Sequence, residues 1–122
     1  MISQPVIRAK LGAMVAKWQA NQALLDVITH QFDTMSIQDQ YTKIGGAVAM
    51  LKFNITQAGD FITDEAVQIF GGRGVTESGM GRIVNRAKRV IKNYKIYGGS
   101  EEIMCDLAAR QMIRAIPKQA KL

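Results

Sequence analysis

Apolar residues recur every three or four positions along most of this chain, which is the period of an α-helix. The first such stripe consists of Ile7, Leu11, Met14, Trp18, Leu25, Ile28 and Phe32. Ser3 and Pro5 precede it and are typical of a helix start. The pattern predicts one helix of about eight turns, and the stretch "DTMS", residues 33–36, is expected to end it.

A second stripe predicts another long helix, which Gly71 and Gly72 should end. Its apolar members are Ile44, Val48, Leu51, Ile55, Ala58, Ile62 and Ile69. Gly45, Gly46 and Gly59 lie inside the stripe, where each glycine costs roughly 1 kcal/mol relative to alanine. We therefore expect other helices to pack closely against this one.

The rest of the chain predicts a loop, a basic helix, a "YGGS" turn and a last helix from about Ser100 to Ile116, which Pro117 should end. In the basic helix an apolar stripe, expected to face the core, consists of Ile83, Ala87, Val90 or Ile91, and Tyr94. Strict alternation of apolar and polar residues never persists, so strands are not expected. The fold class predicted for residues 1–122 is all-α, as one domain.

Charge is concentrated in one segment. The net charge is +6, and six cations without any acid lie between Arg82 and Lys95. This segment is either a solvated face or a contact surface for anions, so one hypothesis is a small basic interaction module that binds nucleic acid or an acidic partner. Aromatic residues for base stacking are nearly absent from the segment apart from Tyr94, which argues against nucleic acid. No apolar run is long enough for a membrane span.

The residue inventory offers little support for catalysis by side chains. His30 is the single histidine and Cys105 the single cysteine. A Ser-His-Asp or Cys-His site would have to use His30, which has no obvious partner in the sequence. No spacing of His, Cys and acids indicates a metal site, so none is expected. The glycines of "FGGRGVTESG" match neither the dinucleotide-binding nor the Walker pattern.

Two glycine-rich stretches carry a resemblance to a known family. "DEAVQIFGGRGVT", residues 64–76, and "IYGGSEEIMCDLAAR", residues 96–110, resemble the signature stretches of the C-terminal helical domain of acyl-CoA dehydrogenases. The helix "SQPVIRAKLGAMVAKWQANQALLDVI" is similar to the family helix before them. The resemblance implies an up-and-down helical bundle that lacks its first helix, in the C-terminal part of an FAD enzyme several hundred residues long.

The resemblance also implies two sets of FAD contacts. Residues matching a stretch that touches the FAD of the neighbouring subunit are Gln68, Ile69, Phe70, Gly71 and Gly72. Those matching the second motif are Ser100, Glu101 and Glu102. Helix-terminal glycines allow the backbone to approach a ligand, and a serine there can cap its helix or bind the cofactor. The two acids already occupy the positive end of the last helix, so a sugar or adenine edge is a better ligand there than a bare phosphate.

The turn "YGG" corresponds to the position of the catalytic base and of a substrate contact in the family. Many family members have "YEG", whose glutamate removes the alpha proton of the acyl-CoA, and Gly98 stands at that position. Residues 1–122 therefore supply no catalytic base; in the "YGG" branch, which includes long-chain enzymes, the base comes from the helix that starts the C-terminal domain. Gly98 and Gly99 are implied as substrate-binding residues, because the N–H at the Gly98 position is the family's donor to the thioester carbonyl.

The function that the resemblance implies is therefore FAD-dependent dehydrogenation of a fatty acyl-CoA to the trans-2-enoyl thioester. The complete enzyme is expected to be a homo-oligomer, and this chain is expected to be inactive on its own. At the other end, Ala120-Lys121-Leu122 resembles the C-terminal S-K-L peroxisomal address. We expect a peroxisomal protein, with a mitochondrial enzyme as the alternative.

Overall fold

The computed structural model describes residues 2–116, and helices make up almost all of this part. The elements are α1 (Pro5–Thr34), α2 (Ile37–Lys43), α3 (Gly45–Phe70), the 3-10 turns η1 (Gly71–Val75) and η2 (Gly79–Gly81), α4 (Arg82–Ile96) and α5 (Glu101–Ala115). Residues 2–116 contain no strand. The all-α prediction is confirmed, and the four long helices begin and end within a few residues of the predicted positions.

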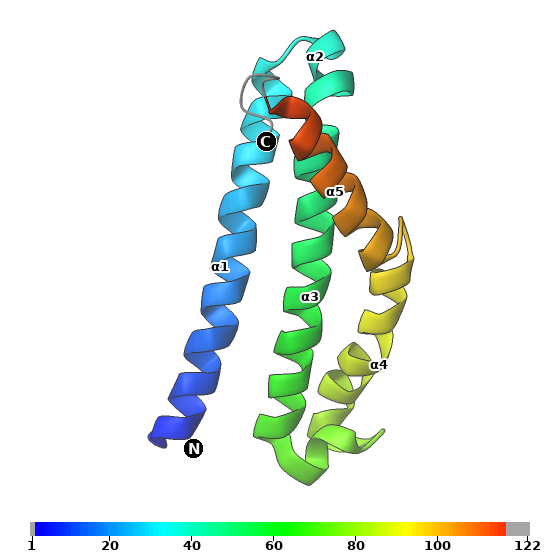
Figure 1. The fold of residues 1–122 in the computed structure, drawn as a ribbon. Coiled ribbons are helices and arrows are strands. Elements are labelled where there is room, and N and C mark those ends of the chain that lie inside the picture. Colours follow the sequence, from blue (N-terminus) through cyan, green and yellow to red (C-terminus); the bar gives the residue numbers. More distant parts are fainter. Residues whose placement is uncertain (1, 117–122) are drawn as a thin grey trace.

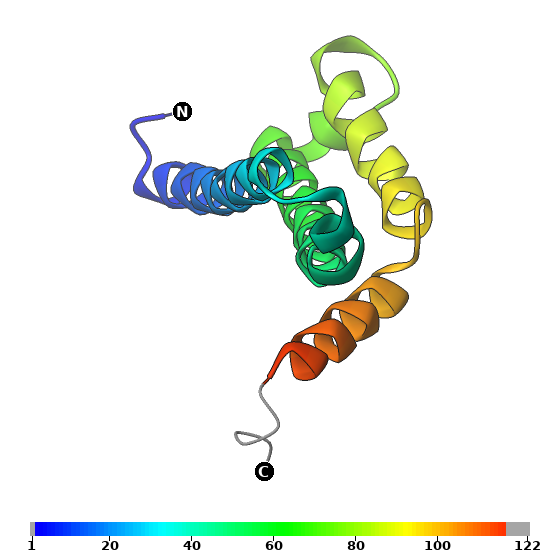
Figure 2. The same ribbon diagram turned by 90° about the horizontal axis from the view of Figure 1, so that it is seen from above.

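Helix α3 is the centre of the bundle and packs against α1, α4 and α5. Figure 1 shows α1 and α3 side by side and antiparallel, with α4 and α5 following each other along the other side of α3, opposite to it in direction. Seen from above, α5 turns away from the line of α4 (Figure 2). The chain thus runs up through α1, down through α3 and up again through α4 and α5, which the Gly98–Gly99 turn separates.

The short helix α2 was not predicted. Its first turn is capped by Ser36, whose side chain accepts a hydrogen bond from the Asp39 N–H at 3.2 Å. The Gln40 amide donates to the Phe32 carbonyl oxygen at 2.8 Å and ties α2 back to the end of α1. Ile37 is 71% exposed, so α2 buries no apolar stripe of the kind that reveals a helix in sequence.

The predicted stripe of α1 merges two neighbouring rows of residues. The seam against α3 follows Ile7, Met14 and Ile28, which are half-buried or buried. Trp18 and Phe32 belong to the adjacent row and are 59% and 41% exposed. Residues four positions apart differ by about 40° around an α-helix, so only one row can be central to a helix contact. Trp18, Leu25 and Phe32 of the predicted stripe are thus exposed in this chain.

The predicted core stripe of α4 was wrong in part. Ile83 and Tyr94 are 72% and 60% exposed. Ile91, one of the two alternatives at its position in the stripe, does pack on α3, together with the half-buried Lys88 and Lys95. Two cations can face the centre because α3 carries acids opposite them, as described below, and buried charges are tolerated where they are paired.

Two of the three interior glycines of α3 mark close helix contacts, as predicted. A Cβ atom at Gly46 would lie 2.8 Å from the Gln111 Cβ of α5, and one at Gly59 would lie 2.6 Å from the Ile91 Cδ1 of α4. Nothing lies within 4 Å of a Cβ built on Gly45, which starts the helix. Over residues 2–116, no helix is both long and apolar enough to cross a membrane.

Candidate functional site

The turn between α4 and α5 presents an uncommitted backbone N–H group at Gly98. Gly98 and Gly99 have φ of 70° and 105°, in the left-handed region that favours glycine. Nothing lies within 4 Å of a Cβ built on Gly98, so this residue borders open space. Among residues 2–116, no oxygen accepts a hydrogen bond from the Gly98 N–H. The turn can therefore donate to an oxygen atom of a ligand.

The side chain of Lys52, on α3, hydrogen-bonds to the backbone of this turn. Its ammonium group donates to the Gly99 carbonyl oxygen at 2.6 Å and to the Lys95 carbonyl oxygen at 3.4 Å. Because Lys95 precedes the turn and Gly99 lies in it, one side chain bridges both.

A charged cluster joins the helices on either side of the turn. The Asp60 carboxylate of α3 pairs with Lys88 and Lys95 of α4, each at 2.8 Å. Lys95 also pairs with Glu101 of α5 at 3.2 Å. Hydrogen bonds from Lys88 and then Lys95 lower the pKa of Asp60 to about 2. The hydrogen bond to Asp60 in turn raises the pKa of both lysines, so Asp60, Lys88 and Lys95 are charged at neutral pH.

Glu101 points into the domain. It is 8% exposed, and its two carboxylate oxygens accept hydrogen bonds from Thr56 Oγ1 at 2.8 Å and Gln57 Nε2 at 3.1 Å. The sequence placed Glu101 with the FAD contacts and at the positive end of α5, whereas the structure directs its carboxylate against α3. With Lys95 included, this carboxylate has three polar partners within the chain.

Ser100, which is half-buried, and Glu102, which is exposed, lie on either side of Glu101 in the sequence. Ser100 is the N-cap residue of α5, but its side chain accepts no hydrogen bond from the helix. Glu102 is exposed, and its own N–H, followed by the Ser100 hydroxyl, lowers the pKa of its carboxyl group. Ser100 thus does not take up the capping role that was one of its two predicted uses.

The other predicted FAD contacts lie at the far end of α3. Gln68 and Phe70 are exposed in its last turn, and Ile69 is half-buried. Gly71 has φ of 59° and ends the helix, and neither Gly71 nor Gly72 has anything within 4 Å of a built Cβ. The C-terminal end of α3 thus offers open backbone to a ligand, as glycines at that position allow.

One chain does not bring the two predicted sets of FAD contacts together. Glu101 contacts Gln57, and Gly71 follows Gln57 by fourteen residues along α3. At 1.5 Å per residue this is a separation of about 20 Å. Figure 1 shows the two glycine turns at different heights, the first at the end of α3 and the second beside its middle.

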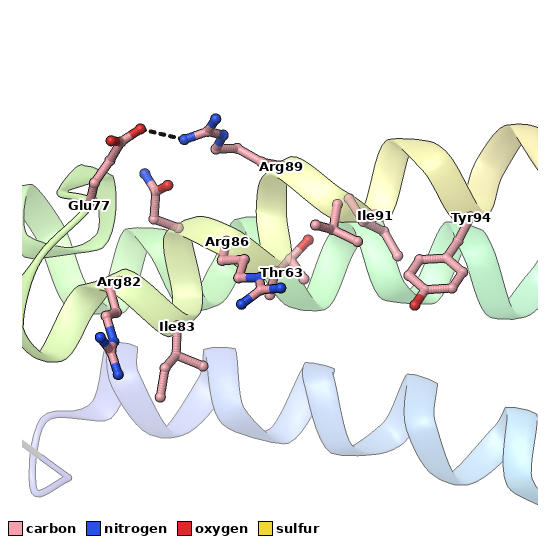
Figure 3. Close-up of a pocket in the computed structure, with 11 residues that line it drawn as sticks. Thr63, Glu77, Arg82, Ile83, Arg86, Arg89, Ile91 and Tyr94 are labelled. Atoms are coloured by element: carbon pink, nitrogen blue, oxygen red, sulfur yellow. Dashed lines mark hydrogen bonds and ion pairs between the residues drawn. The ribbon is translucent and has the colours of Figure 1, made fainter.

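An open groove of about 1080 Å³ lies over α4. Its walls combine apolar side chains, namely the exposed Ile83 and Tyr94 and the half-buried Val90, with the basic side chains of Arg82, Arg86 and Arg89. Figure 3 shows Arg89 paired with Glu77 at one rim and Ile83 and Arg82 directed away from α4 on another side.

The sequence analysis missed Lys52, Thr56 and Asp60, which carry most of the polar contacts described above. A signal for them was present. These residues and Asp64 recur at steps of four, which places a polar row along one side of the helix. A polar row on a central helix indicates a network inside the bundle, because buried polar groups need partners.

Comparison with known proteins is consistent with these features. The sequence profile described as "Acyl-CoA dehydrogenase, C-terminal domain" matches residues 1–113. The chain is 27% identical to acyl-CoA dehydrogenase ApdG of Emericella nidulans over 121 residues, which are 99% of this chain and 28% of that protein. It is 29% identical to acyl-CoA dehydrogenase AFT10-1 of Alternaria alternata over 113 residues, or 91% of this chain and 26% of that protein.

A third relative is the probable acyl-CoA dehydrogenase YdiO of Escherichia coli K12, which is 32% identical over 76 residues, or 62% of this chain and 19% of that protein. No solved structure matches the chain. The chain spans little more than a quarter of the length of the first two relatives, ApdG and AFT10-1. The profile covers nearly the whole chain, and both glycine turns lie within the match. The chain belongs to the acyl-CoA dehydrogenase family, of which it carries the C-terminal helical domain.

Proposed function

We propose that this chain is part of an FAD-dependent enzyme that converts a fatty acyl-CoA to the trans-2-enoyl-CoA. The observation that carries the proposal is the unpaired Gly98 N–H in the Gly98–Gly99 turn, within a stretch that matches the family's second motif. In this proposal the Gly98 N–H donates to the thioester carbonyl oxygen. Such a donor stabilises the enolate charge that develops as the alpha proton leaves.

The residues present fit a flavin cofactor in most of the predicted places. FAD, when bound, accepts the hydride from the β-carbon. Gly71 and Gly72 offer open backbone, and the exposed Gln68 and Phe70 stand beside them. The Ser100 hydroxyl oxygen can accept a hydrogen bond from a ligand because it does not cap α5. Glu101 fits less well as a direct contact, since its carboxylate already has three partners within the chain.

The separation of the two sets of contacts supports assembly of several copies. A single FAD in contact with both sets of one chain would have to reach around the bundle over about 20 Å. In a homo-oligomer, the Gln68–Gly72 stretch of one copy reaches the FAD held near Ser100 of another. We propose that arrangement. The catalytic base then lies outside residues 1–122, because Gly98 has no side chain to serve as one.

The competing hypothesis, a basic module for nucleic acid or an acidic partner, is not favoured. Of the six cations between Arg82 and Lys95, Lys88, Arg89 and Lys95 pair with acids of this chain. Half of the cations on which the hypothesis rests are thus paired within the fold, which weakens a general attraction to polyanions.

Flavin chemistry tests the proposal. The polypeptide encoded by the whole reading frame that includes these residues should purify with bound FAD, and a fatty acyl-CoA added without oxygen should bleach the flavin absorbance near its visible maximum. The 122-residue chain alone should bind FAD weakly and show no turnover. A whole polypeptide that folds but neither binds flavin nor reacts with any acyl-CoA would refute the proposal.

We also propose a peroxisomal location. It is supported by the end of the sequence, Ala120-Lys121-Leu122, which lies outside the residues that the structure describes. A fluorescent protein that ends in the last ten residues should collect in peroxisomes and become diffuse when Leu122 is deleted. Collection in mitochondria, or a diffuse signal from the intact tail, would contradict this location.

A further inference from the structure

We propose that Lys52 is a positioning residue whose ammonium group sets the orientation of the Gly98–Gly99 turn. The inference rests on the proposed function, in that the Gly98 N–H is the group whose direction would matter. Lys52 lies on the central helix α3 and donates to the carbonyl oxygens of Gly99 at 2.6 Å and Lys95 at 3.4 Å. An ammonium group has three donors, so it can hold both at once.

The turn has few other restraints. Glycine loses more backbone freedom on ordering than any other residue, and two glycines follow each other here in the left-handed region. Within residues 2–116 the Gly98 N–H has no acceptor, and Ser100 does not cap α5 through its side chain. Among the described residues, the half-buried Lys52 supplies the side-chain hydrogen bond to the glycine backbone, at 2.6 Å from the Gly99 carbonyl oxygen.

The ion pairs of Lys95, near the turn, restrain the helices and not the glycine backbone. Lys95 pairs with Asp60 at 2.8 Å and with Glu101 at 3.2 Å, which joins the end of α4 to α3 and to the start of α5. These bonds run through side chains on the two sides of the turn and leave the peptide groups of Gly98 and Gly99 untouched. Loss of Lys52 should thus loosen the glycines while the flanking helices stay in place.

Backbone dynamics test this directly. Nitrogen-15 relaxation of the 122-residue chain should give order parameters of about 0.85 for the Gly98 and Gly99 N–H groups, and Lys52→Met should lower them below about 0.6. Methionine keeps the length and the apolar stem but has no donor. Lys52→Arg restores the donors and should return the values towards those of the wild-type chain. Lys43→Met, which removes an exposed lysine of α2, is the matched control and should change nothing at the turn.

Unchanged order parameters in a folded Lys52→Met chain would overturn the proposal. If that variant does not fold, Lys52→Gln, whose amide can reach only one of the two carbonyls, replaces it under the same criterion. If neither folds, Lys52 serves general stability and the proposal also fails. The proposed function is tested separately, by the shift of the Gly98 N–H resonance when a fatty acyl-CoA is added to the whole polypeptide. Absence of that shift removes the thioester role and leaves the result on turn order intact.

Discussion

Gly81→Ala should lower the free energy of unfolding by about 3 kcal/mol, because it forces a methyl group into backbone that cannot yield. A Cβ built on Gly81 lies 1.6 Å from the Arg73 carbonyl oxygen and 2.4 Å from its carbonyl carbon. To make room, η2 has to separate from η1, the turn that begins with Gly71 and Gly72. Thermal unfolding followed by circular dichroism should show a loss of roughly 10 °C in Tm.

Gly12→Ala is the matched control for this prediction. Gly12 lies inside α1, and nothing is within 4 Å of its built Cβ. The same chemical change should there stabilise the chain by up to about 1 kcal/mol, through the better helix propensity of alanine. If Gly81→Ala unfolds at the temperature of the wild-type chain, the close contact between the two 3-10 turns is incorrect.

Glu101→Ala should destabilise the chain by about 2–3 kcal/mol, because it removes a buried, charged acceptor with three donors. Thr56 and Gln57 would lose their partner across the helix contact, and Lys95 would keep only Asp60. Glu101→Gln keeps the shape and one acceptor oxygen, so it should cost less. Urea unfolding of the variants gives these differences.

Glu102→Ala controls for the position of Glu101 in the first turn of α5. Glu102 is exposed and adjacent, so its loss removes a similar negative charge from the same helix end without disturbing α3. Its effect should stay within about 0.5 kcal/mol. Equal losses for Glu101→Ala and Glu102→Ala would show that helix-end charge, and not the buried network, accounts for the effect.

Helix periodicity was enough to predict the all-α fold and the positions of the long helices, because apolar spacing and glycine stops are local signals. It was not enough to orient α4. The six cations left Ile83, Ala87, Val90 or Ile91, and Tyr94 as its apparent core face, yet the acids on α3 attract Lys88 and Lys95 to the inside. That preference depends on which helix becomes the neighbour, and a single helix's pattern does not contain this information.

The candidate site was predicted only in part, because some of its contacts also depend on which helices become neighbours. The glycines at positions 71, 72, 98 and 99 have the positive φ values or open surroundings that their places in the motifs require. The role of Lys52 could not be predicted from those motifs, since it reaches the turn from a residue 47 positions earlier in the sequence. Glu101 stands in a motif but is directed inward by Thr56 and Gln57, which only the packing of α5 on α3 brings near it.

The central claim is that the Gly98 N–H holds the thioester carbonyl oxygen, and infrared spectroscopy of that carbonyl group tests it most directly. A fatty acyl-CoA labelled with carbon-13 at the thioester carbonyl would be bound to the whole polypeptide, in the native form and with Gly98 replaced by glycolate, which deletes the N–H and keeps the turn. We predict that the carbonyl stretch moves to lower frequency in the native form and returns towards its solution value in the glycolate form. The same stretching frequency in both forms would contradict the claim.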